Sequence, residues 1–300
     1  MFTALYCEGL PMTALFALAT CLMWGLSDFG GGLLTRRFPA LTVVVISQSI
    51  TVAVLGAVVL ATGAFGEAGP RLWYAIGAGL VGPTAMLAFY RALALGPMGV
   101  VSSLGALGVV VPVSVALLLG EPPGILQFAG IAVAIAGVGL AGGPELCGAP
   151  VQRQTVLFTL FAAFGFGAVM ALISEASTTV TGLFLALFVQ RVTNIVVGGV
   201  ALWLSARRGH PALPAEGGGP RMLVAALPAL AFVGLSDVAA NGTYALAAQH
   251  GPATIAAVLA SLYPVVTALA ARGLLKERLR AVQAAGAGLA LVGTLLLATG

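Results

Sequence analysis

Apolar runs of about 20 residues repeat along the whole of this 300-residue chain. A helix rises about 1.5 Å per residue, so each run is long enough to cross roughly 30 Å of hydrocarbon. The composition agrees, because 60% of the residues are hydrophobic and 7% are charged, whereas soluble domains carry about 25% charged residues. The runs lack the strict alternation of transmembrane barrel strands. We therefore expect an all-α membrane protein.

Charged residues, Gly-Pro pairs and hydropathy divide the chain into ten expected transmembrane helices. Residues 1–12 hold no Lys or Arg before the first apolar run, so we interpret them as a short interfacial or disordered tail rather than a cleaved signal peptide. Residues 143–153 form the linker between the fifth and sixth helices. The expected helices are 13–34, 41–62, 71–94, 98–119, 125–142, 154–174, 182–205, 222–248, 253–273 and 281–298.

The two halves of the chain, 13–142 and 154–298, align with each other. A shift of 142 residues pairs Gln48 with Gln190, and a shift of 155 pairs Gly79 with Gly234. Each half has five crossings, and an odd number of crossings means that a tandem duplication inverts the second half. We therefore expect two inverted five-helix repeats around a pseudo-two-fold axis in the membrane plane, an architecture that transporters use to alternate access to a central site.

Several residues in these repeats resemble a known family. Trp24 and Gly25 form an aromatic-Gly pair in the first helix, Glu121 and Glu277 close the fourth and ninth helices, and Pro264 lies thirteen residues before Glu277. Together with the duplication, these features are similar to the drug/metabolite transporter superfamily, in its ten-helix branch of EamA-type exporters. The resemblance covers essentially both repeats, and it makes the aromatic amino-acid exporters of that branch a candidate.

Three ionisable residues lie deep inside expected helices, whereas Arg91 and Glu175 fall near helix ends, where their side chains could reach the interface. A charge at mid-bilayer costs about 2.5–3.5 kcal/mol on insertion scales, so such residues are functional candidates. Asp28 lies in the last third of the first helix, Arg191 within the seventh and Asp237 near the middle of the eighth. Arg191 needs a counter-charge or a water-filled cavity, and Asp237 or Asp28 is the expected partner. We expect both carboxylates to border the cavity between the repeats, where either could also carry a proton.

Polar and aromatic side chains complete the expected site. Asp237, Asn241 and Tyr244 recur at a spacing of three and four residues and so share a helix face, which either lines a cavity or joins helices by hydrogen bonds. Aromatic residues, with Phe166 among them, either form apolar walls or pack the core. The resemblance implies that serines of the fourth and ninth helices flank the cavity. The predicted substrate-binding residues are Trp24, Asp28, Gln48, Tyr90, Ser102, Phe164, Gln190, Arg191, Asn194, Asp237, Asn241, Tyr244, Ser261 and Tyr263.

We expect a secondary transporter that exports small amphipathic metabolites, amino acids above all, by alternating access. Nucleotide sugars and lipid-linked metabolites are the alternative substrates, although a pyrophosphate would need several buried cations. A channel is less favoured because the inverted duplication indicates alternating access. An enzyme is not expected, since His210 and His250 lie far apart without acid/base or metal-ligand spacing. No phosphate-binding Gly-rich motif is present, so ATP does not drive transport directly.

Other partners follow from composition. No cofactor or metal is expected, because Cys7, Cys21 and Cys147 lack ligand spacing. The net charge of +4 is dispersed, which argues against nucleic acid and leaves a small-molecule substrate and membrane lipid as partners. A monomer is sufficient, since one chain holds both repeats. Arginine far outnumbers lysine in a chain rich in Ala and Gly, which indicates a GC-rich bacterial genome, and we therefore expect the bacterial inner membrane.

The basic residues are distributed unequally between the two sides of the membrane. The positive-inside rule places the richer side in the cytoplasm and both termini outside, whereas the family resemblance implies both termini inside. The opposite side holds Arg71. The richer side holds Arg36, Arg37, Arg153, Arg207, Arg208, Arg221, Lys276, Arg278 and Arg280.

Overall fold

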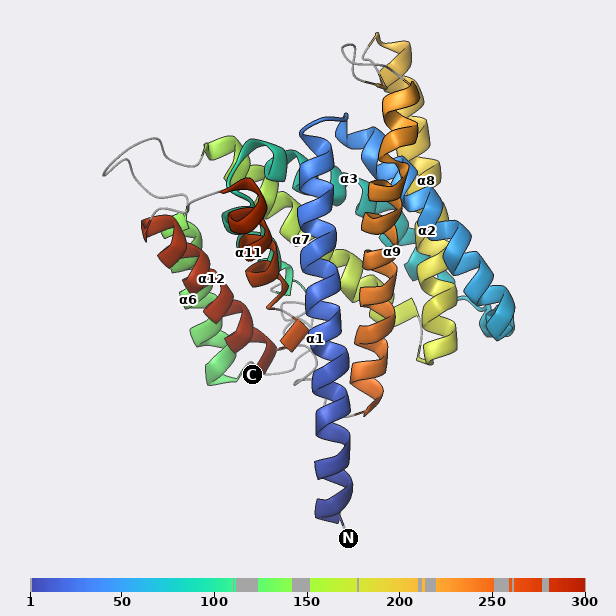
Figure 1. Cartoon of the computed structure of the whole chain (residues 1–300). Helices are drawn as coiled ribbons and strands as arrows, with labels where there is room; N and C mark the ends of the chain where they lie inside the picture. Colours follow the sequence, from blue (N-terminus) through green and yellow to red (C-terminus); the bar gives the residue numbers. More distant parts are fainter. Residues whose placement is uncertain are drawn as a thin grey trace.

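The computed structural model describes residues 2–109, 111, 124–141, 152–176, 178–209, 212–213, 220–250, 259–260, 262–276 and 281–299. Every regular element in these residues is a helix, as the sequence predicts (Figure 1). The first half contains α1 (Phe2–Thr35), α2 (Ala40–Thr62), α3 (Leu72–Leu95), α4 (Met98–Gly105) and α6 (Ile125–Ala141), with the short 3-10 helices η1 (Ala64–Glu67) and η2 (Ala106–Val109). The second half contains α7 (Arg153–Ala176), α8 (Val180–Arg207), α9 (Pro220–His250), α11 (Tyr263–Leu275) and α12 (Ala281–Thr299).

The distribution of polar and apolar side chains suits a membrane. Six of the described helices are long and apolar enough to cross it, and four shorter apolar helices accompany them. The outer surface is apolar, with Ile125 88% exposed and Trp73 74% exposed. The interior holds polar side chains such as Gln48, which is 2% exposed. Polar groups must find partners inside the protein where the surrounding solvent is hydrocarbon. The fold is that of an all-α membrane protein.

The helices pack in pairs that join the two halves. In the sequence alignment α7, α8, α9, α11 and α12 correspond to α1, α2, α3, α4 and α6. α1 packs along α9 and α3 along α7, while α2 packs on α8, α4 on α11 and α6 on α12 (Figure 1). When the two halves are exchanged, the α1–α9 pair becomes the α7–α3 pair. The α2–α8, α4–α11 and α6–α12 pairs are each converted into themselves. A two-fold axis between two repeats produces this pattern.

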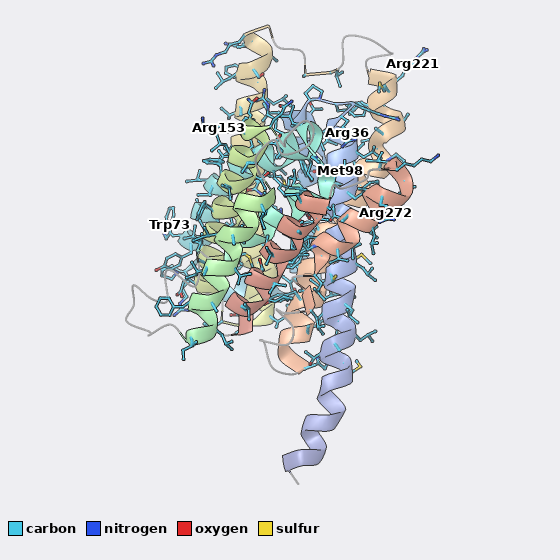
Figure 2. All side chains as sticks on the ribbon, turned by 90° about the vertical axis from the view of Figure 1, so that its left-hand side faces the viewer. Arg36, Trp73, Met98, Arg153, Arg221 and Arg272 are labelled. Carbon is cyan, nitrogen blue, oxygen red and sulfur yellow. The ribbon has the colours of Figure 1, made fainter. Side chains whose placement is uncertain are left out.

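The repeats run in opposite directions through the bundle. α1 begins at the lower end and finishes beside Arg36 at the upper end, whereas α7 begins at Arg153 at that upper end (Figure 2). Figure 2 also places Arg221 at the upper end and Trp73 below the level of Arg153. The first helices of the halves are therefore antiparallel, and the repeats are inverted.

Two glycines related by the duplication make two close helix crossings possible. A Cβ atom added at Gly79 of α3 would lie 2.8 Å from the carbonyl oxygen of Gln190 on α8. A Cβ atom at Gly234 of α9 would lie 2.6 Å from the carbonyl oxygen of Ser47 on α2. Gln190 and Ser47 lie at neighbouring positions in the repeat alignment, so both halves use the same crossing. Small residues at such crossings let helix backbones approach closely.

The expected N-terminal tail is a helix. α1 begins at Phe2, although residues 1–12 were predicted to be interfacial or disordered. Ala4, Leu5 and Glu8 have high helix propensity, so the membrane helix extends toward the N-terminus through them.

Two predicted helices are interrupted at equivalent positions of the repeats. The helix expected over 98–119 is α-helical from Met98 to Gly105 and then tightens into η2; Val111 is helical again, and residues 110 and 112–119 lie outside the described part. The helix expected over 253–273 has a turn at Leu262, after which α11 begins with Pro264 in its first turn; residues 253–258 lie outside the described part. Pro264 lacks an N–H group and crowds the preceding turn, which explains the second break.

Candidate functional site

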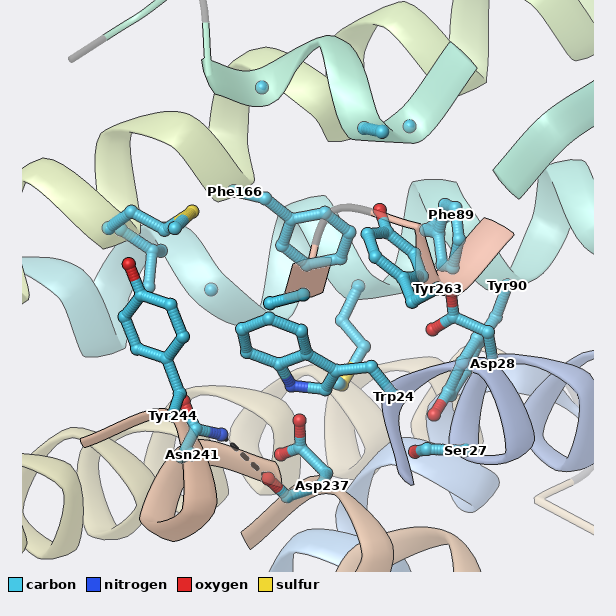
Figure 3. Close-up of a pocket in the computed structure, with 18 of the residues that line it drawn as sticks. Trp24, Ser27, Asp28, Phe89, Tyr90, Phe166, Asp237, Asn241, Tyr244 and Tyr263 are labelled. Atoms are coloured by element: carbon cyan, nitrogen blue, oxygen red, sulfur yellow. Dashed lines mark hydrogen bonds between the residues drawn. The ribbon is translucent and has the colours of Figure 1, made fainter. Parts of the chain in front are cut away.

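A cavity of about 250 Å³ lies between the two repeats (Figure 3). Helices α1, α3, α7, α8 and α9 supply most of its wall, and the segments around the breaks after α4 and before α11, together with Thr294 of α12, supply the rest. Its lining residues are Trp24, Ser27, Asp28, Gly82, Met86, Phe89, Tyr90, Gly105, Ala106, Gly108, Phe166, Val169, Met170, Gln190, Arg191, Asn194, Asp237, Asn241, Tyr244, Ala260, Tyr263 and Thr294.

The lining residues follow the register of the duplication. The 142-residue shift relates lining positions on α1 to lining positions on α7, and the 155-residue shift does the same for the third and fourth segments of each half. The related pairs are Trp24 and Phe166, Ser27 and Val169, Asp28 and Met170, Gly82 and Asp237, Met86 and Asn241, Phe89 and Tyr244, Gly105 and Ala260, and Gly108 and Tyr263.

The lining residues occupy equivalent positions in the two repeats, but their side chains differ in polarity. The wall formed by α1 and α9 carries Ser27, Asp28, Asp237 and Asn241. The wall formed by α3 and α7 carries apolar residues such as Phe166 at the equivalent level (Figure 3). The cavity is therefore polar on one side and apolar on the other, which suits an amphipathic ligand.

Arg191 is fixed at the polar side by two partners. Its Nη2 lies 2.5 Å from Oδ2 of Asp237, and its Nη1 donates a hydrogen bond to Oε1 of Gln48 at 2.9 Å. Asn241 donates to the backbone carbonyl of Asp237 at 2.7 Å, one turn back in α9. Arg191 is 7% exposed, so its charge is almost removed from solvent and Asp237 compensates it.

Asp28 has a neutral partner instead of a cation. Ser102 of α4 donates from Oγ to Oδ2 of Asp28 at 3.2 Å, and Ser102 Oγ also lies 3.3 Å from Oγ1 of Thr267 on α11. Thr267 donates to the carbonyl of Gly25 at 3.0 Å. These hydroxyl groups join α1, α4 and α11 directly beneath the cavity wall.

The amide of Asn194 joins α8 to α3. With its nitrogen directed at the backbone, Asn194 donates to the carbonyls of Gly79 at 3.0 Å and Gln190 at 3.3 Å. Gln190 is 4% exposed, and its Oε1 has no hydrogen-bond partner among the described residues.

Aromatic rings form two groups around the cavity. Trp24 lies between Tyr244 and Tyr263, with ring centroids 6.0 Å away from each. Phe89 and Phe166 meet edge to face at 5.5 Å. These separations are favourable for aromatic pairs, which therefore hold one another in place as rigid walls.

Comparison with known proteins agrees with this architecture. The sequence profile of the EamA-like transporter family matches residues 11–143 and, a second time, residues 153–299. The chain belongs to the EamA-like transporter family. The family resemblance inferred from the sequence is confirmed, and the protein is an integral membrane transporter of the drug/metabolite transporter type.

Solved structures share the fold of this chain. A crystal structure described only as "Crystal structure of protein" aligns with a TM-score of 0.58 at 18% identity, over 95% of this chain and 96% of that chain. At this identity the likeness concerns the fold alone. No curated protein matches the sequence significantly.

The structure brings together ten of the residues predicted for the site of this EamA-like transporter. Gln48 and Ser102 lie behind the wall, where they hold Arg191 and Asp28. Phe164 does not line the cavity, because it is 56% exposed on the outer face of α7, so that prediction is wrong. Ser261 lies outside the described residues. The ten that line the cavity are Trp24, Asp28, Tyr90, Gln190, Arg191, Asn194, Asp237, Asn241, Tyr244 and Tyr263.

The repeat alignment identifies several of the lining residues that were not predicted. Once Trp24, Asp28 and Tyr244 are chosen, the two shifts point to their equivalents on α7 and α3. Apolar residues such as these are indistinguishable from ordinary core residues when they are considered singly. The unpredicted lining residues are Ser27, Gly82, Met86, Phe89, Gly105, Ala106, Gly108, Val169, Met170, Ala260 and Thr294.

Proposed function

We propose that this protein is a secondary transporter that exports small amphipathic metabolites across a bacterial inner membrane, with amino acids, aromatic ones first, as the leading candidates. The observation that carries the proposal is the two-sided cavity between the inverted repeats. Its polar side offers charged groups for the head of a substrate, and its aromatic side offers a wall for an apolar body.

Alternating access is the mechanism that this architecture favours. The cavity is surrounded by pairs of helices that exchange under the two-fold relation, and rocking of one repeat against the other would expose it to each side in turn. The interruptions at Gly105 and Leu262 lie in or next to the wall, where helix breaks are tolerated because they border a cavity. One chain supplies both repeats, so a monomer would suffice.

The charge of the cavity favours a small amphipathic metabolite, such as an amino acid, over a nucleotide sugar. Among the described lining residues Arg191 is the only cation, and Asp237 already compensates it. A pyrophosphate would meet two carboxylates with no spare positive charge. The alternative substrates named from the sequence therefore gain no support from the site.

Efflux from proteoliposomes tests the proposal. Vesicles preloaded with radiolabelled amino acids are followed with and without a pH gradient, for the native chain and for Arg191→Gln. Arg207→Gln is the matched control, because Arg207 lies at the outer end of the same helix, over the ring of Trp203. We expect saturable efflux that Arg191→Gln abolishes and Arg207→Gln retains; equal efflux in both variants, or none for any amino acid, would contradict the proposal.

A further inference from the structure

The cavity wall carries one carboxyl group, that of Asp28, without a cationic partner among the described residues. Its charged residues in the described part are Asp28, Arg191 and Asp237. Arg191 and Asp237 neutralise each other at 2.5 Å. Asp28 receives a hydrogen bond from Ser102, and no Lys, Arg or His of the described residues lies within ion-pair distance of it. With both carboxylates ionised, the site therefore has a net charge of one negative unit.

The surroundings of Asp28 favour a cation. Tyr90 and Tyr263 are close enough to Asp28 to interact with its charge, and both rings lie near its carboxylate in Figure 3. Aromatic faces attract cations, more strongly where water is excluded.

The same wall offers little to a carboxylate. Both terminal nitrogens of Arg191 are engaged, one by Asp237 and one by Gln48. The remaining Nε has no hydrogen-bond partner among the described residues, but the protein covers it from the cavity. A substrate carboxylate would have to displace Asp237 from Arg191 and would place a third negative group in the cavity.

Building on the proposed function, we propose that the preferred substrate is a monocationic aromatic amine, an amphipathic molecule with an ammonium group and no carboxylate. Its ammonium group binds Asp28, and its ring packs against Phe89 and Phe166 across the cavity. The small volume, about 250 Å³, suits one ring with a short chain. Amino acids then bind through the ammonium group alone, and more weakly.

Three compounds with the same ring and chain test this proposal on the native protein in detergent. Isothermal titration calorimetry is used because amines leak through vesicles. We expect phenethylamine to bind at least about tenfold more tightly than phenylalanine, which corresponds to one charge-assisted interaction, and 3-phenylpropanoate not to bind. Phenylalanine binding as tightly as phenethylamine would overturn the proposal, and the comparison needs no variant.

The Asp28→Asn variant tests whether the carboxylate of Asp28 is the group that binds the ammonium group. We expect it to weaken phenethylamine binding at least about tenfold and to leave phenylalanine and phenethylamine alike. Glu67→Gln is the matched control, since it neutralises an exposed carboxylate in η1 outside the cavity lining, and it should retain the preference for the amine. A heat of sodium binding that Asp28→Asn abolishes, with no heat for phenethylamine, would assign the charge to an inorganic cation and overturn the proposal.

The efflux and binding experiments distinguish a wrong substrate preference from a wrong transport function. Efflux of amino acids without any preference for amines would leave the proposed function standing and remove this inference. Absence of efflux for amino acids and of binding for all three compounds would remove both.

Discussion

Arg191 of α8 and Asp237 of α9 form an ion pair at 2.5 Å inside the cavity, and Gln48 of α2 holds the other end of the same guanidinium group at 2.9 Å. The side chains of Arg191 and Asp237 are 8% and 17% exposed. Three helices from both repeats therefore meet at one buried charge. Buried pairs of this kind are costly to break, because the remaining charge has no partner.

Removal of either partner should destabilise the protein more than removal of both. We expect Arg191→Gln and Asp237→Asn each to lower the midpoint of thermal unfolding in detergent, and the double variant to recover part of the loss. The coupling should be at least about 1 kcal/mol, within the range for contacting residues. Unfolding followed for the four proteins measures it, and strictly additive effects would contradict the pairing.

The two phenylalanines of the Phe164-Gly165-Phe166 segment should differ in their effect on transport. Phe166 lines the cavity, whereas Phe164 is 56% exposed on the outer surface. We expect Phe166→Ala to raise the KM for transport of an aromatic amino acid about tenfold or more, because a buried aromatic contact with the substrate is lost. Phe164→Ala should leave KM unchanged. Equal effects of the two substitutions on KM would contradict the assignment of the apolar wall.

Gly234 and Gly199 form a matched pair for the helix crossing. A Cβ atom at Gly234 would lie 2.6 Å from the carbonyl oxygen of Ser47, whereas one at Gly199 would meet nothing within 4 Å. Gly234→Ala should cost about 1–3 kcal/mol of stability through overpacking. Gly199→Ala should be neutral or stabilise by up to about 1 kcal/mol, since Ala favours helix. Thermal unfolding distinguishes them, and a stable Gly234→Ala variant would show that the crossing is looser than described.

The sequence predicted the class of fold because hydrocarbon imposes simple rules on composition and helix length. It also predicted the charged part of the site, because an intramembrane Arg191 demands a partner such as Asp237. The breaks near Gly105 and Leu262 were not predicted. Hydropathy averages over a window and is insensitive to local backbone geometry, so an apolar segment with a broken helix looks like a continuous one.

The apolar wall could be predicted only in part, for a different reason. Phe164 and Phe166 are both large, aromatic and two residues apart, and only the position of α7 in the bundle decides which one turns inward. The alignment of Trp24 with Phe166 carries that information, because equivalent positions of inverted repeats face the same axis.

The positive-inside rule predicts that both termini lie outside the cytoplasm. Arg36, Arg153 and Arg221 gather at the end of the bundle opposite to the start of α1 (Figure 2), and the cytoplasmic side of membrane proteins is enriched in such residues. Fusion of alkaline phosphatase or green fluorescent protein to the C-terminus distinguishes the orientations. We expect active phosphatase and no fluorescence, whereas fluorescence with inactive phosphatase would place the termini inside.

Binding of substrate beside Trp24 tests the central claim most directly. The chain has three tryptophans, of which Trp73 and Trp203 are 74% and 52% exposed on the outer surface. Trp73→Phe and Trp203→Phe together leave Trp24, in the cavity wall, as the only reporter. We predict a saturable change in its fluorescence on titration with phenethylamine or phenylalanine. The affinity obtained from this change should equal the affinity measured by calorimetry. Calorimetric binding without any change in Trp24 fluorescence would contradict a substrate site between the repeats.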